Sequence, residues 1–227
     1  LENSMGLDLY SNDLSLSFDT TVYEDLNKDN GDRYEYILPK INLVKKIDNN
    51  TSLDGNFSFK SQALVRNYNT NVYEKTNINE LIFSSYPNMT KGGFYNNYEF
   101  IIKNSNTDTQ KSSNYKKNEN FYASGLFQYN ASLPLINESK DYQKILKPKL
   151  SLKLAPKHTK DQRGEYSRID VNNIYSLSRV TNNDSIEGGM SFIFGNDFSI
   201  YNKKESREVF NLKLANNVRV EENDDLP

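Results

Sequence analysis

The stretch FYASGLFQYNASLPL, residues 121–135, separates its apolar and polar side chains by alternation. From Phe121, every second residue is apolar or small, and from Tyr122 the residues between them are mostly polar. A period of two is typical of a β-strand with two chemically different faces. Because strands in globular proteins run about 5–6 residues, this stretch predicts an unusually long strand.

The same alternation recurs along the chain, and no segment shows a sustained helical period. Polar clusters separate the alternating segments, as turns between strands do. We therefore expect an all-β antiparallel fold of about ten to twelve strands. The alternating segments are residues 13–23, 34–47, 55–65, 92–103, 121–135, 146–156, 168–177, 186–201 and 209–220. The expected turns and loops are residues 27–32, 46–55, 104–120, 157–166 and 180–185.

The composition narrows the class of protein. The 227 residues include 28 Lys+Arg and 30 Asp+Glu, a net charge of -2, which argues against a nucleic-acid partner. Hydrophobic residues make up only 36%, yet 16 Tyr and 12 Phe are too many aromatic residues for a disordered chain. There are 0 Cys, so neither disulfides nor thiolate metal sites are possible within these residues. No apolar run is long enough for a membrane-spanning helix.

Long strands with one apolar and one polar face fit two architectures. In a soluble β-sandwich or β-solenoid, the apolar face forms the core, and this alternative stays open. In a transmembrane β-barrel, the apolar face meets lipid and the polar face lines the lumen. The length of the strands favours the barrel, and so does the position of tyrosines near segment ends, where an interfacial girdle would place them. These tyrosines are Tyr10, Tyr23, Tyr34, Tyr68 and Tyr201.

The sequence offers no catalytic constellation. The only histidine, His158, lies among lysines, and no GxSxG stretch accompanies it. Residues 24–35 resemble a calcium loop, but the loop glycine is one place late and a tyrosine, Tyr36, stands where glutamate is needed. Asp184 and Glu187 share a turn region without forming an evident acid–base pair. We expect no enzymatic activity, no cofactor and no metal site, and we read the sequons at Asn88 and Asn130 as chance matches.

Three stretches of the chain carry a family resemblance. They are RYEYILPKI (33–41), ASLPLI (131–136) followed by LKPKLSLKLAPKHTKDQ from Leu146, and VNNIYSLSRVTNNDSIEGGMSFIFGNDF (171–198). In this order they resemble one strand, a second segment and a strand pair of the LptD family, the outer-membrane barrels that assemble lipopolysaccharide. In that pair the matching positions are Arg179, Asp184, Ile186 and Gly189.

This resemblance implies a function and a set of partners. It implies export of lipopolysaccharide into the outer leaflet of a Gram-negative outer membrane, with an LptE-like lipoprotein plug in the lumen. It also implies a periplasmic bridge protein, which would bind an upstream jellyroll domain, and contact with membrane lipid. Residues 1–227 would then be one internal segment of the barrel domain, without the jellyroll, the flanking strands or the cysteines of many members.

The matching motif positions read as barrel architecture, so the resemblance assigns no functional residue. They are Pro39, Pro134, Pro148, Arg179 and Gly189. Because proline has no backbone donor, the three prolines should lie at strand ends, bulges or local breaks in pairing.

Other functions remain as alternatives. A passive porin-like channel would use residues 104–120 as a constriction loop. An outer-membrane protease or phospholipase would need an acid–base pair. A soluble adhesin would need a repeat period, and the sequence shows none.

Overall fold

The computed structural model of the chain describes residues 1–113, 118–156, 169–179 and 185–220. These residues form an all-β structure with one short 3-10 helix at Asn30–Arg33. Within them, no helix has the length and apolar character needed to cross a membrane. The strands are β1 Glu2–Tyr10, β2 Leu14–Glu24, β3 Tyr34–Ile47, β4 Gly55–Tyr68, β5 Val72–Ser85, β6 Asn88–Met89, β7 Tyr95–Gln110, β8 Asn118–Ser132, β9 Leu135–Glu138, β10 Tyr142–Ala155, β11 Gly189–Asn202 and β12 Arg207–Arg219.

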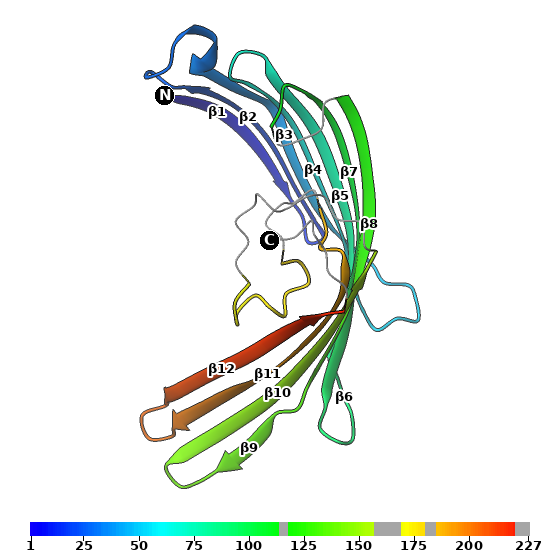
Figure 1. Cartoon of the computed structure of the whole chain (residues 1–227), viewed down its shortest axis with the longest axis vertical. Helices are drawn as coiled ribbons and strands as arrows, with labels where there is room; N and C mark the ends of the chain where they lie inside the picture. The colour runs from blue at the N-terminus through cyan, green and yellow to red at the C-terminus, as the bar shows by residue number, and fades with distance from the viewer. Residues whose placement is uncertain (114–117, 157–168, 180–184, 221–227) are drawn as a thin grey trace. The chain divides into compact units, whose positions relative to one another are not determined.

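The strands belong to one antiparallel sheet of twelve strands, as the alternation predicted (Figure 1). Its order is β1-β2-β3-β4-β5-β7-β8-β10-β11-β12, and the short strands β6 and β9 pair with β7 and β10. Among the described residues no pairing joins β1 to β12, so the sheet is open. The chain divides into two compact units, which we describe separately. Unit 1 is residues 1–52, 56–83 and 101–124, and unit 2 is residues 53–55, 84–100 and 125–227.

The three prolines lie where a missing backbone donor is tolerated. Pro39 lies at a bulge, because the pairing of β3 with β4 shifts register between Ile37 and Lys40. Pro134 lies in the gap between β8 and β9. Pro148 pairs with β11, but on its other side β9 has ended and β8 begins pairing only at the next residue. The prediction for these three residues is confirmed.

Several predicted elements are wrong. Residues 104–110, expected in a loop, continue β7, and 118–120 begin β8. Backbone pairing builds a strand there without apolar residues, because sheet hydrogen bonds do not depend on the side chain. Residues 169–177, expected in a strand, form turns instead. Strands β1 and β5 had not been recognised from the sequence.

The bulge at Pro39 also changes which face a side chain lies on. Ile37 and Ile41 are four residues apart, so alternation alone predicts one common face. In the sheet, Ile37 lies opposite Arg66 and Ile41 lies opposite Ala63. Arg66 and Ala63 point to opposite faces of β4, and an extra residue in a strand reverses its alternation in this way. Ile37 therefore shares a face with Arg66, which binds Glu35.

In unit 2, the polar face of the sheet is the more buried one. On β10 and β11, Ser151, Lys153 and Ser191 are buried, whereas Phe192 and Phe194 on the opposite face are exposed. We call these the polar face and the apolar face of unit 2. The apolar face also carries Leu146, Leu154, Met190, Phe210, Leu212, Leu214 and Val218, all of them exposed. A soluble protein would bury this face in its core.

Candidate polar site on the inner face of unit 2

The strand register gathers polar residues into rows across the polar face. One row runs from Gln128 on β8 to Lys153 on β10, Ser191 on β11 and Arg219 on β12. Each pair in this row lies directly opposite in the antiparallel ladder, where side chains are close enough to interact. The next row is Asn130, Ser151, Ile193 and Asn217. No alternation in a single strand could reveal these rows, because they depend on which residues pair.

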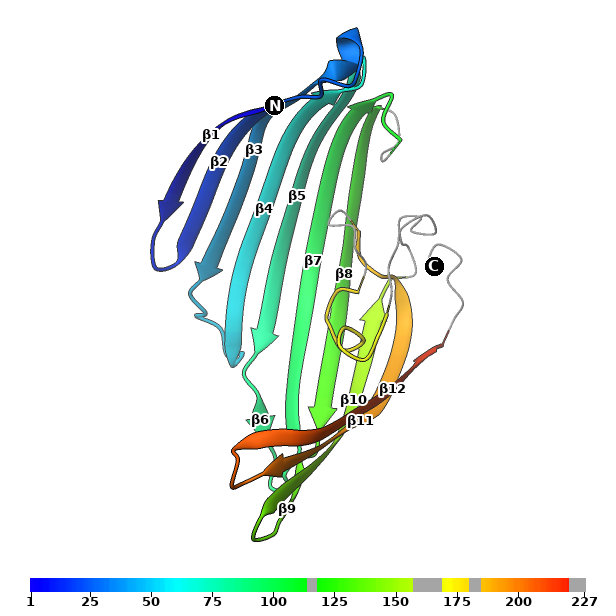
Figure 2. The same ribbon diagram turned by 90° about the vertical axis from the view of Figure 1, so that its left-hand side faces the viewer.

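Residues 169–179 lie over this polar face and are held there by hydrogen bonds (Figure 2). The segment turns on Asp170, whose side-chain oxygen accepts hydrogen bonds from the backbone nitrogens of Asn172 at 2.7 Å and Asn173 at 3.2 Å. Such a turn satisfies backbone groups locally, so no strand partner is needed. We call residues 169–179 the inner segment.

Side chains of the polar face reach the carbonyls of the inner segment. The amide of Gln128 donates to the carbonyl of Tyr175 at 2.7 Å. The ammonium of Lys153, only 2% exposed, donates to the carbonyls of Ser176 and, at 3.2 Å, of Leu177. A buried lysine needs such acceptors, because an ammonium without partners is costly away from water. These three hydrogen bonds bind the inner segment to β8 and β10.

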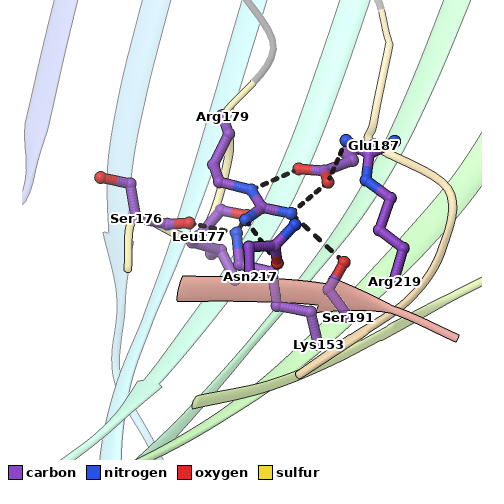
Figure 3. Close-up of polar contacts among 8 residues, drawn as sticks. All are labelled: Lys153, Ser176, Leu177, Arg179, Glu187, Ser191, Asn217 and Arg219. Carbon is purple, nitrogen blue, oxygen red and sulfur yellow. Dashed lines mark hydrogen bonds and ion pairs between the residues drawn. The ribbon is translucent and has the colours of Figure 1, made fainter. Parts of the chain in front are cut away.

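Arg179 ends the inner segment in a buried ion pair with Glu187 (Figure 3). Their side chains are 1% and 4% exposed. Arg179 donates from Nε to Oε2 of Glu187 at 2.7 Å and from Nη2 to Oε1, so the pair is bidentate. Arg179 also donates to Asn217 at 3.2 Å and to Ser191 at 3.3 Å. The guanidinium therefore links the inner segment to both β11 and β12.

Positive charge exceeds negative charge around Glu187. Arg219 is a second cation on the same carboxylate, with Nη2 3.3 Å from Oε1. Burial of Glu187 alone would raise its pKa, but the hydrogen bond and charge of Arg179 and the charges of Lys153 and Arg219 outweigh burial. The pKa of Glu187 is consequently lowered, and the carboxylate stays ionised at neutral pH. One anion thus holds together several cations that would otherwise repel each other.

Tyr175 fits against the sheet because β11 carries a glycine beneath it. A Cβ at Gly195 would lie 2.6 Å from the Tyr175 hydroxyl oxygen and 2.2 Å from the carbonyl oxygen of Leu214. Both distances are shorter than real Cβ contacts allow. Lys149 lies over the Tyr175 ring, 5.1 Å from its centre, and also pairs with Asp197. The aromatic ring is thereby held between β10 and β11.

The residues that the sequence singled out have different outcomes. His158 and Asp184 lie outside the described residues. Glu187, considered as half of an acid–base pair, is instead the partner of two arginines. In the turn after β2, Asp25 accepts a hydrogen bond from the backbone nitrogen of Asn27, as acidic turn residues do. Across the described parts of the chain, no three His, Cys, Asp or Glu side chains gather as a metal site would require.

The two sequon asparagines lie on strands of the sheet. Asn88 lies in β6, and Asn130 lies on the polar face, where it accepts a hydrogen bond from Gln128. Sequence reasoning did not identify Lys153, Ser191, Asn217 or Arg219 as members of a site. Its one relevant signal was Arg179, which the resemblance had marked as an architectural position, and the ion pair is consistent with that reading.

Comparisons with known proteins place the chain in no family. No family model matches its sequence, and no curated protein matches it either. The geometry of the sheet and of the inner segment therefore carries the functional argument.

Proposed function

We propose that this chain forms part of a transmembrane β-barrel in the outer membrane of a Gram-negative bacterium. The observation that carries the proposal is the reversed burial in unit 2, where apolar side chains are exposed and polar side chains are buried. A hydrocarbon surround favours this arrangement, because apolar groups can face lipid while polar groups line a wet lumen. Strands of 13–16 residues, such as β7, β10 and β12, exceed the roughly 9–11 needed to span a bilayer.

The open sheet sets a requirement for this barrel. In lipid, the unpaired backbone groups of an edge strand would have no partner, so spanning sheets close on themselves. Strands β1 and β12 end the order of the sheet. The proposed barrel is therefore completed by strands other than the twelve described, which pair with β1 and β12.

We further propose that the barrel exports lipopolysaccharide, as the resemblance to the LptD family implies. The proposed transport makes and breaks no bond. Acyl chains move along apolar surface into the outer leaflet, while the sugars cross the hydrated lumen. An LptE-like lipoprotein in the lumen and a periplasmic bridge protein would be the partners. The polar face, with its lysines, arginines and amides, supplies the hydrophilic wall that such sugars need.

Neighbouring residues on β12 test the membrane orientation. Because the chain has 0 Cys, Leu212→Cys and Asn211→Cys would each carry a single spin label. Leu212 is on the apolar face, and Asn211 lies one residue away and points to the other face. In lipid vesicles the label at Leu212 should be more accessible to oxygen, and the label at Asn211 to a water-soluble nickel complex. The reverse pattern, or equal accessibility, would contradict the barrel.

A photo-crosslinking residue at Asn211 tests the cargo. In living cells, the full-length protein should crosslink to lipopolysaccharide from this position, and crosslinking should stop when export is de-energised. The same residue at Leu212, on the apolar face, is the matched control and should crosslink to phospholipid instead. Barrel insertion without any crosslink to lipopolysaccharide would remove the export function and leave the barrel intact.

A passive porin-like channel is the second candidate, and one observation favours it. The residues expected to constrict such a channel, 104–120, are mostly strand, but the inner segment lies on the polar face. A segment folded against the wall would narrow a lumen. Purified protein in planar bilayers should give steady ion conductance if it is a porin, and little conductance if a plug fills an export barrel.

A further inference from the structure

A pocket in unit 2 has the lining of a saccharide site. It measures about 560 Å³ and lies on the polar face, between Tyr175 of the inner segment and strands β7, β8 and β10. Besides Tyr175, its polar lining residues are Tyr95, Asn96, Asn97, Asn130, Ser132, Lys147 and Lys149. This volume is in the range of small-molecule sites.

The prolines of unit 2 explain why the sheet opens at this pocket. Pairing of β10 with β9 ends at Leu146, and pairing with β8 begins at Lys149. Lys147 and Pro148 therefore have no residue in register on that side, where the backbone nitrogen of Leu133 donates to the Pro148 carbonyl at 3.0 Å and Pro134 lies in the opposite gap. Pro134 lines the pocket. The break in pairing thus leaves a recess where an unbroken ladder would have been continuous.

The charge of the pocket is positive. Of the residues that the structure describes, no acidic one lines the pocket, whereas two lysines do. Asp197 lies directly opposite Lys147 in the ladder, but its ion pair goes to Lys149. Among the described residues, Lys147 has no carboxylate partner of its own. Its ammonium is available for a charge-assisted hydrogen bond with an anion.

The remaining lining groups suit a sugar ring. Asn96 and Asn130 already accept hydrogen bonds from Tyr129 and Gln128, so their amides keep N–H donors for a sugar hydroxyl, while the amide of Asn97 can both donate and accept. Tyr95 and Tyr175 both line the pocket, and Lys149 covers one side of the Tyr175 ring. Aromatic surface therefore lies next to the polar groups, which matches the alternating C–H and O–H character of a sugar. A simple anion would need the lysines but neither the amides nor the rings.

We propose that this pocket binds a sugar that carries a negative charge. In this respect the inference deepens the proposed function and rests on it, since the sugar part of a lipopolysaccharide has this chemistry. A free sugar phosphate has the same chemistry, and the experiment separates the two sources. Lys147 binds the anionic group, the amides bind the hydroxyls, and Tyr175 packs against the ring.

The first measurement is ligand-observed saturation-transfer NMR on the whole chain in detergent micelles. The probes are glucose 6-phosphate, glucose and inorganic phosphate. We expect saturation of the sugar protons of glucose 6-phosphate, with binding at least 10-fold tighter than that of glucose or phosphate. Equal binding of glucose would overturn the role of charge. Equal binding of inorganic phosphate would overturn the role of the sugar.

Two lysines of the same strand provide the variant and its control. Lys147→Gln removes the charge and should weaken binding of glucose 6-phosphate at least 10-fold, while leaving binding of glucose unchanged. Lys144→Gln, three residues away, points to the other face and should have no effect. If both variants bind like the parent protein, or if an acidic peptide binds as tightly and depends on Lys147, the proposal fails.

A competition experiment then distinguishes the two sources of the sugar. Because the chain has 0 Trp, Tyr95→Trp would place a single tryptophan at the pocket, which can be excited selectively over tyrosine. Lipopolysaccharide micelles that displace glucose 6-phosphate from this reporter would identify a lipid headgroup as the ligand. Binding of glucose 6-phosphate without such displacement would identify a soluble sugar and overturn the link to export. Failure of the proposed barrel is separate, because the labels at Leu212 and Asn211 report it.

Discussion

Replacing Glu187 with glutamine should release the inner segment from the sheet. Glu187 is the anion that Arg179 and Arg219 share, and Arg179 is only 5% exposed. Removing one partner of a buried ion pair costs about 3–5 kcal/mol, because the other charge is left without compensation. Glutamine keeps one acceptor oxygen, so we expect the free energy that holds the inner segment on the sheet to fall by about 3 kcal/mol. At about 1.4 kcal/mol per factor of ten, the population with the inner segment detached should rise roughly 100-fold.

Hydrogen exchange measures that population directly. The backbone nitrogen of Ile174 donates to the carbonyl of Asp170 at 3.0 Å, and that of Ser176 donates to Asn173 at 2.9 Å. When exchange follows local opening, its rate is proportional to the detached population. Both amides should therefore exchange roughly 100-fold faster in Glu187→Gln. Amides of β10 that pair with β11 should keep their protection, which would show that the sheet is intact.

A second glutamate provides the matched control. Glu205 pairs with Arg207 in the turn between β11 and β12, but these side chains are 49% and 67% exposed. Exposed ion pairs contribute about 0–1 kcal/mol, so Glu205→Gln should leave both amides unchanged. The double variant Arg179→Met/Glu187→Leu should cost less than Glu187→Gln, because it leaves no unpaired Arg179 charge. Unchanged exchange at Ile174 in Glu187→Gln would refute this explanation of how the segment is held.

Three further predictions address pH, packing and the apolar face. The pKa of Glu187 is lower in the folded state than in the unfolded state. The ionised carboxylate therefore stabilises the fold fully above its unfolded pKa of about 4.3. This stabilisation is lost as the pH falls through the lower pKa of the folded state. Exchange at Ile174, corrected for intrinsic rates, should therefore accelerate as the pH falls below about 4.3 in the parent chain but not in Glu187→Gln; equal profiles would contradict the assignment. Gly195→Ala should lower the free energy of unfolding by about 1–3 kcal/mol, because the new Cβ on β11 meets the Leu214 carbonyl on β12. A thermal unfolding midpoint equal to that of the parent would show that β11 and β12 can move apart to accept the methyl group. Phe127→Arg should cost about 2–4 kcal/mol in vesicle refolding titrations if Phe127 lies at the bilayer midplane, whereas Phe127→Leu should cost much less; similar costs would indicate that lipid does not contact this position.

The structure changes one expectation about the polar face of unit 2. Alternation places Gln128 on the polar face next to Phe127, so the sequence predicts that an arginine at Gln128 is tolerated. Gln128 is in fact fully buried and donates to the Tyr175 carbonyl at 2.7 Å. Because the inner segment covers this position, Gln128→Arg should displace Tyr175 rather than be mild. The difference arises because alternation identifies a face and carries no information about what covers it.

The sequence by itself determined the local features of the fold. A strict period of two specified long strands with unlike faces, as in β8, because successive side chains of an extended chain point in opposite directions. Proline chemistry specified where pairing must be interrupted, and Pro39, Pro134 and Pro148 follow that rule. These are properties of each residue and its immediate neighbours, so they can be recognised from sequence alone.

The tertiary structure alone decided how distant residues meet. The row of Gln128, Lys153, Ser191 and Arg219 exists only in one strand register, and a shift by one residue would move each side chain to the other face. Likewise, residues 169–177 alternate like a strand, yet they lie over the polar face as turns because Lys153 and Gln128 bind their carbonyls. The favourable free energy of these contacts comes from hydrogen bonds and ion pairs among polar groups of four strands, and it offsets the cost of burying those groups. Pairing between strands is a long-range property, and this is why the site emerged only once the chain was folded.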